Sequence, residues 1–139
     1  MSTARRMLAG LVALGAAVAS ITGCSTNSPQ ENVSQACTAA RAHASALTSF
    51  KATLKPDVPI EQVRSARDEV VKTYNDLVKA TENVAKDQVE AVKAAENKFA
   101  SAVNAVPDQA TLPQAVDSLR DEAVNVQAAV SDLTTEIKC

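Results

Sequence analysis

Apolar residues recur with a helical period over most of the chain. Between residues 33 and 54, apolar or small side chains return every three or four positions, with one gap at Lys51. This spacing places them on one face of an α-helix. Pro56 and Pro59 follow, and a proline disfavours helical backbone at the residue before it. The pattern therefore predicts a first helix that begins near Val33 and ends before Pro56.

The same spacing continues without a gap from residue 112 to residue 137, which predicts a last helix. Thr111 and Gln114 stand three positions apart, as in a capping box, where two side chains satisfy the free amides of a helix start. Pro113 lies between them, in the first turn, where proline is tolerated. We therefore expect this helix to begin near Thr111.

The segment from Ile60 to Val106 contains neither glycine nor proline and has two parallel patterns. One is an apolar stripe at residues 60, 63, 70, 74, 78, 85, 89, 92, 99, 103 and 106. The other is a ladder of alternating charge at residues 64, 68, 72, 76, 79, 82, 86, 90 and 93, typical of an exposed helical face. Because the ladder crosses the midpoint unbroken, we expect one helix of about 47 residues, about 70 Å long.

The sequence thus predicts an all-α fold of antiparallel helical hairpins. The favoured arrangement is an elongated three-helix rod around the long central helix. The alternative is a four-helix bundle, in which the chain bends near Glu82–Asp87 and both termini share one end. The rod is favoured because no turn residue marks that bend.

Two segments resemble each other internally. Residues 63–71 (VRSARDEVV) and 116–124 (VDSLRDEAV) share six of nine positions, and each follows a Pro-Asp pair and, before it, a phenylalanine (Phe50 or Phe99). This predicts a duplicated hairpin with halves 37–85 and 86–139. Chance similarity between helices rich in the same few residue types is the open alternative.

Composition separates the first residues from the rest. All three glycines lie within residues 1–23, which excludes a glycine-rich nucleotide site in the remainder. Arg5 and Arg6 precede an apolar run from Met7 to about Ile21, the pattern of a secretory signal. An uncleaved transmembrane helix is the alternative, but about 15 apolar residues is short against the roughly 20 that span a bilayer.

The end of that run, Ile21-Thr22-Gly23-Cys24, resembles the lipobox of bacterial lipoproteins. The resemblance implies that residues 1–23 are a signal peptide, that Cys24 carries a lipid, and that the protein is anchored on the extracytoplasmic face of the cell membrane. The polar segment Ser25–Asn32 then reads as part of a flexible tether, 24–32, before a helical domain, 33–139. The Ala/Val-rich composition is also similar to that of small helical lipoproteins of actinobacteria.

Lipidation of Cys24 would leave Cys37 and Cys139, an even pair in an oxidising compartment. We expect a disulfide between them, for which the chain-entropy model gives about 4 to 5 kcal/mol. Two free or intermolecular thiols are the alternative. A core built largely from small side chains buries little apolar area per residue, so a long crosslink is an expected compensation.

No catalytic or metal-binding pattern is visible. His43 is the only histidine, and we expect it to be a partly exposed structural residue on the first helix. Zinc would need several Cys or His ligands, and the carboxylates are spaced as a solvated helix face. Removal of residues 1–23 removes two arginines and no acid, which takes the formal charge from −2 to −4. This acidic balance argues against a nucleic-acid partner.

These observations predict a non-enzymatic lipoprotein without cofactor that acts as an interaction module or accessory subunit of an envelope complex. One alternative is a carrier of an apolar ligand between helices. Another is a spacer to the cell wall, similar to the murein lipoprotein of enteric bacteria. That family ends in a lysine joined to peptidoglycan, whereas Cys139 follows Lys138 here.

Overall fold

The computed structural model describes residues 28–108, 113 and 115–139. This part of the chain forms four α-helices in sequence order. Their bounds are Pro29–Thr53 for α1, Ile60–Thr81 for α2, Lys86–Asn104 for α3 and Val116–Glu136 for α4. The all-α prediction is confirmed.

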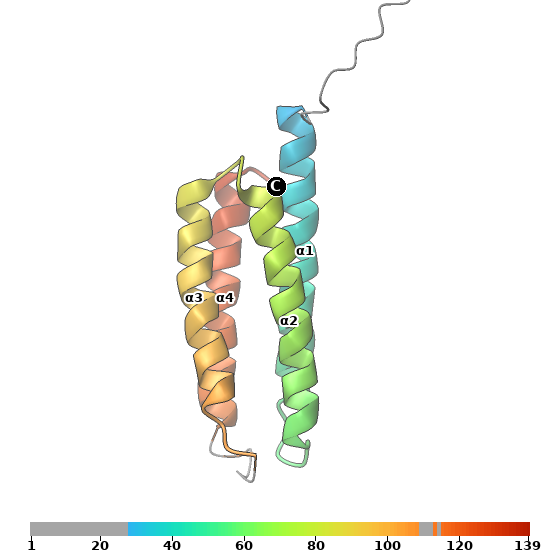
Figure 1. Ribbon diagram of the computed structural model, residues 1–139, viewed down its shortest axis with the longest axis vertical. Coiled ribbons are helices and arrows are strands. Elements are labelled where there is room, and N and C mark those ends of the chain that lie inside the picture. The colour runs from blue at the N-terminus through green and yellow to red at the C-terminus, as the bar shows by residue number, and fades with distance from the viewer. Residues whose placement is uncertain (1–27, 109–112, 114) are drawn as a thin grey trace, which may run out of the picture.

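The helices form two antiparallel hairpins that lie side by side (Figure 1). We call α1 with α2 the first hairpin, and α3 with α4 the second hairpin. Contacts of α1 with α4 and of α2 with α3 close the bundle. The start of α1, the α2–α3 connection and the end of α4 lie at one end, which we call the disulfide end, and the first turns of α1 stand beyond it (Figure 1).

The predicted rod is wrong, and the four-helix alternative is confirmed. The expected helix from Ile60 to Val106 breaks after Thr81 and resumes at Lys86, within the predicted bend region. The break lets α2 and α3 run side by side, so the apolar stripes of both bury against one core. A straight helix would have kept the two parts of that stripe apart.

Local hydrogen bonds explain how the chain turns there without glycine or proline. The Thr81 hydroxyl donates to the carbonyl of Leu77 at 2.7 Å, and the Thr81 carbonyl accepts from the amides of Val84 and Ala85 at 2.9 and 3.1 Å. Ala85 then leaves the helical region, with φ −155° and ψ 68°. No side chain caps α3 at Ala85, so the turn has no cap signature in the sequence.

Helix α1 begins earlier than expected. Residues 29–32, predicted as part of the flexible tether, form the first turn of α1. The Ser28 amide donates to the Glu31 carboxylate at 2.8 Å, and the Glu31 amide donates to the Ser28 hydroxyl at 3.3 Å. Together these bonds form a capping box, and Pro29 fits the first turn. The Ser28 bonds also hold the pKa of Glu31 below its ordinary value.

The structure tests the predicted start of the last helix only in part. Thr111 and Gln114, the predicted capping pair, lie outside the described residues. Helix α4 begins at Val116, after Pro113, and its apolar face is buried along its whole length.

All four helices contribute to one core. Its largest fully buried side chains include Phe50 and Phe99, whose rings meet edge to face with centroids 4.7 Å apart. The rest of the core is mainly valine, leucine and alanine, which allows close helix approach.

Candidate functional site

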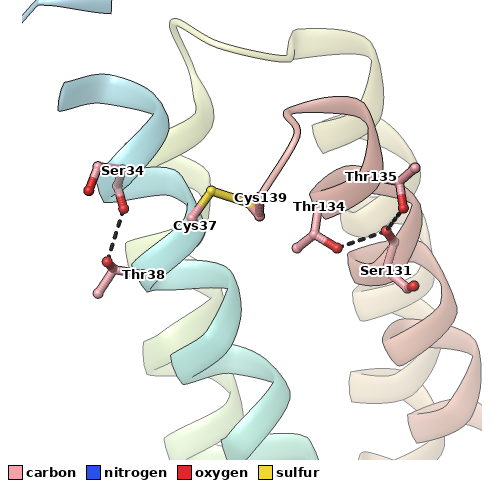
Figure 2. The surroundings of a disulfide bond; sticks show 7 residues. All are labelled: Ser34, Cys37, Thr38, Ser131, Thr134, Thr135 and Cys139. Carbon is pink, nitrogen blue, oxygen red and sulfur yellow. Dashed lines mark hydrogen bonds between the residues drawn. A yellow bond between two sulfur atoms is a disulfide. The ribbon is translucent and has the colours of Figure 1, made fainter. Parts of the chain in front are cut away.

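The disulfide between Cys37 and Cys139 joins the two hairpins at one end of the bundle. Cys37 lies on α1 and Cys139 lies just past the end of α4, with Cα atoms 5.6 Å apart (Figure 2). The predicted pair is therefore present in the structure. It closes nearly the whole helical domain into one covalent loop, since the two residues are 102 positions apart.

The turn that places Cys139 beside α1 is a Schellman motif. The amide of Cys139 donates to the carbonyl of Thr134 at 2.9 Å, and the amide of Lys138 donates to the carbonyl of Thr135 at 3.2 Å. Both bonds satisfy free carbonyls of the last helical turn. Lys138 has φ 59°, a left-handed conformation that favours glycine. The turn redirects the chain from the α4 axis toward α1 (Figure 2).

A cluster of three polar side chains lies in the middle of the bundle, and we call it the buried polar cluster. It consists of His43 on α1, Thr73 on α2 and Glu96 on α3. His43 Nδ1 lies 3.0 Å from Thr73 Oγ1, and His43 Nε2 lies 3.5 Å from Glu96 Oε2. His43 is fully buried, so the expectation of a partly exposed histidine is wrong.

The Glu96 carboxylate is the unusual member of this cluster. Its side chain is only 4% exposed. Among the described residues, neither carboxylate oxygen has a hydrogen-bond partner, and His43 Nε2, 3.5 Å away, has none either. A buried, unsatisfied polar group costs about 1 to 3 kcal/mol, and a charged one more. The Glu96 carboxylate therefore lowers the stability of the core, unless it has a role other than stabilising the fold.

Helix packing alone does not require polar residues at these positions. In the register of the internal repeat, His43 corresponds to Val92, Glu96 to Leu47 and Thr73 to Val126. All three counterparts are apolar and at most 1% exposed. The two hairpins therefore differ in chemistry at the centre of the bundle.

Glu96 and Thr81 are functional candidates that the sequence pattern did not predict, although a signal was present. The apolar stripe skips a position between Val92 and Phe99 and another between Val78 and Ala85. Glu96 and Thr81 fill those gaps, and both are buried. A third interval of seven residues, between Val63 and Val70, contains no buried residue. Such a gap therefore indicates a polar core residue at two of its three occurrences.

A surface groove of about 570 Å³ lies along α2 and α3, and we call it the α2–α3 groove. Tyr74 lines it, and the Tyr74 ring centroid lies 6.1 Å from that of His43. Burial, followed by the charges of Glu96 and Glu90, raises the pKa of Tyr74. The Tyr74 side chain thus borders both the groove and the buried polar cluster.

The other predicted features of the site have different outcomes. Cys24 lies outside the described residues. Within the described part of the chain, no three histidine, cysteine or acidic residues group as metal ligands would. None of the four described helices is both long and apolar enough to cross a membrane.

Comparison with known proteins adds no relative. The chain matches no protein-family model, no curated protein and no solved structure.

Proposed function

We propose that the protein is a lipid-anchored, non-enzymatic module of a bacterial cell envelope, which serves as an interaction partner or accessory subunit of a membrane complex. The observation that carries the proposal is the lipobox-like segment Ile21-Thr22-Gly23-Cys24, at the end of an apolar run and four residues before the Ser28 cap of α1. A lipid on Cys24 would attach the membrane directly to the first helix.

The early start of α1 limits how far the bundle can lie from a lipid on Cys24. Four residues span at most about 14 Å, so Ser28 would lie within that distance of the lipidated cysteine. The disulfide end would then stand near the lipid headgroups. Helix α1 has 25 residues and is about 37 Å long, so the α1–α2 connection could be held that far from the membrane.

The disulfide and the core support an extracytoplasmic location. Disulfides persist in oxidising compartments outside the cytoplasm. The Cys37–Cys139 bond crosslinks a core of mostly small and medium apolar side chains. Such a domain gains most from a covalent link that ties its first helix to its last.

The surroundings of His43 weigh against a catalytic role for this residue. A general base must reach the proton that it removes, and His43 is fully buried against Thr73 and Glu96. The core between the helices contains fully buried side chains from all four of them, Phe50 and Phe99 among the largest, which weighs against the apolar-carrier alternative.

Metabolic labelling tests the anchor. Cells that express the protein are fed an alkyne analogue of palmitate, and the wild type is compared with Cys24→Ala and with Cys37→Ala/Cys139→Ala. We expect label and membrane fractionation in the wild type and the double variant, and loss of both in Cys24→Ala. Equal labelling of wild type and Cys24→Ala would contradict the proposal.

Crosslinking in intact cells tests the accessory role. A photo-crosslinking residue is placed at exposed positions of α2 and α4, for example Asp76 and Asn125, and products are identified after membrane extraction. We expect a defined adduct with one membrane protein from one face of the bundle. A protein that gives no adduct from any position would contradict this role while leaving the anchor intact.

A further inference from the structure

His43 and Glu96 meet across the boundary between the two hairpins. His43 lies on α1 and Glu96 on α3, and His43 Nε2 lies 3.5 Å from Glu96 Oε2. Both residues are buried in the core. A carboxylate beside a neutral imidazole would place one net negative charge there, which is costly in apolar surroundings. That cost is removed when the pair holds one more proton.

The Thr73 hydroxyl indicates which nitrogen of His43 carries a hydrogen. Thr73 Oγ1 donates its one hydrogen to the backbone carbonyls of Glu69 and Val70, both at 3.0 Å. The hydroxyl oxygen is then left to accept, so His43 Nδ1, 3.0 Å away, is the donor. A neutral imidazole with its hydrogen on Nδ1 has a bare Nε2. The lone pair of that nitrogen would face the Glu96 carboxylate with no hydrogen between them.

No cation of the described residues is buried beside this pair. Tyr74 on α2 has its ring centroid 6.1 Å from that of His43, and a phenol is neutral at pH 7. The charged residues near the pair in sequence on α1, α2 and α3 are all exposed: Arg41, Glu69, Lys72, Asp76, Glu90, Lys93 and Lys98. The buried residues of α4 are all apolar. The half-buried Glu122 of α4 lies about 25 Å along the chain from the disulfide, whereas His43 lies about 9 Å from it, so the two are at different levels of the bundle.

We propose that His43 and Glu96 form a proton-binding site, in which the folded protein at neutral pH holds one proton between Nε2 and Oε2 in addition to the hydrogen on Nδ1. The proton resides on either partner, as imidazolium beside carboxylate or as imidazole beside carboxylic acid. Both forms leave the core without net charge. Because each hairpin supplies one partner, the site exists only while the hairpins are packed together. It does not depend on the lipid anchor.

This site links folding to pH. In an unfolded chain, an ordinary glutamic acid releases its proton near about pH 4.3 and an ordinary histidine near about pH 6.5. Between these values the unfolded chain also holds one proton on the two groups, so they cause no change in stability. Above about pH 6.5 the folded protein holds one proton more than the unfolded chain. The equilibrium constant for unfolding then rises up to about tenfold per pH unit, until the pair itself releases the proton.

The single histidine of the chain makes the site directly observable. The full chain, with its disulfide intact and without a histidine tag, is labelled with nitrogen-15 and carbon-13. The ring nitrogens of His43 and the carboxyl carbon of Glu96 are followed by NMR from about pH 5 to about pH 9. We expect Nδ1 to be protonated throughout and, at about pH 7.5, a second proton on Nε2 or on the Glu96 carboxyl group. An ionised Glu96 beside a singly protonated His43 at that pH would overturn the proposal, whichever nitrogen carries the hydrogen.

A pair of variants tests the link to folding. Glu96→Gln keeps the size of the side chain but removes its acidic proton, and Glu90→Gln, at an exposed position of the same helix, is the matched control. Urea unfolding should show that the wild type and Glu90→Gln are less stable at about pH 8 than at about pH 6. Glu96→Gln should show the opposite trend, because a lone buried His43 stays neutral while the unfolded chain gains a proton in mild acid.

The same pH trend in Glu96→Gln and in the wild type would contradict the proposal. If Glu96→Gln does not fold, the NMR titration of the wild type decides the question, since it needs no substitution.

Discussion

Phe50 on α1 and Phe99 on α3 pack edge to face, with ring centroids 4.7 Å apart and an interplanar angle of 79°. They join the two hairpins across the core, near the end opposite the disulfide. Cys37, His43 and Phe50 follow one another along α1, about two turns apart. Each meets the second hairpin in a different way, through a covalent bond, a buried polar contact and an aromatic pair.

Truncation of either ring should destabilise the protein strongly. Both side chains are fully buried, so Phe50→Ala or Phe99→Ala should lower the free energy of unfolding by about 3 to 5 kcal/mol. A double-mutant cycle in urea should give a coupling of about 0.5 to 1.5 kcal/mol between the rings. Strict additivity of the two losses would show that the edge-to-face contact contributes nothing of its own.

The buried polar cluster should cost stability that apolar residues can recover. His43→Leu alone leaves the buried Glu96 carboxylate without the group that faces it. It should lower the free energy of unfolding by about 3 to 5 kcal/mol. His43→Leu combined with Glu96→Leu should be neutral or up to about 4 kcal/mol more stable than the wild type. Urea unfolding of the three proteins measures this. A double variant less stable than the wild type would mean that the cluster is a net stabilising contact.

The disulfide should supply a large part of the stability. Cys37→Ala/Cys139→Ala should lower the free energy of unfolding by about 2 to 5 kcal/mol, because the unfolded chain regains the freedom of a very long loop. Thermal unfolding with and without reductant provides the measurement. Reductant should affect the wild type and leave the double variant unchanged, and a reductant effect on the double variant would point to another cause.

Lys138→Gly should stabilise the turn before the disulfide. Lys138 has φ 59°, which costs an ordinary residue about 1 kcal/mol and glycine almost nothing. Lys138→Ala is the control, since it removes the charge but keeps the Cβ atom. We expect a higher unfolding midpoint for the glycine variant only. A gain of equal size in both variants would assign the effect to charge.

Alkaline pH should weaken the fold partly through Tyr74. The folded protein has a raised pKa for Tyr74, so the unfolded chain releases this proton at lower pH than the folded one. The Tyr74 contribution is fully present below the unfolded value of 10.0 and is lost as the pH rises through the folded value. Urea midpoints at about pH 8 and about pH 11 compare the wild type with Tyr74→Phe. Tyr74→Phe should lose less stability, and an equal loss in both would contradict the Tyr74 assignment.

The apolar stripes predicted the helices correctly because buried residues recur with the helical period. The last helix, the end of the first and the pairing of Cys37 with Cys139 were all predicted, and the structure contains them. The Ser28/Glu31 capping box was equally readable, but the polar composition of residues 25–32 was taken as a sign of a tether. A cap signal outweighs local polarity when an apolar stripe follows.

The break between α2 and α3 could not be read from local residue types. Thr81, Asn83 and Ala85 carry no strong turn signal, and the charge ladder continues across them. The turn forms because burial of both stripes in one core stabilises it, a tertiary effect that local propensity does not contain. The same holds for His43, whose burial depends on Thr73 and Glu96 from two other helices.

The mass of the intact protein, extracted from the membrane of a bacterial host, tests the lipid anchor and the disulfide together. We expect a chain that begins at Cys24, carries a diacylglyceryl group on that residue, and gains two hydrogens on reduction of the Cys37–Cys139 bond. A chain that begins at any other residue, or one with an unmodified Cys24 thiol, would contradict it.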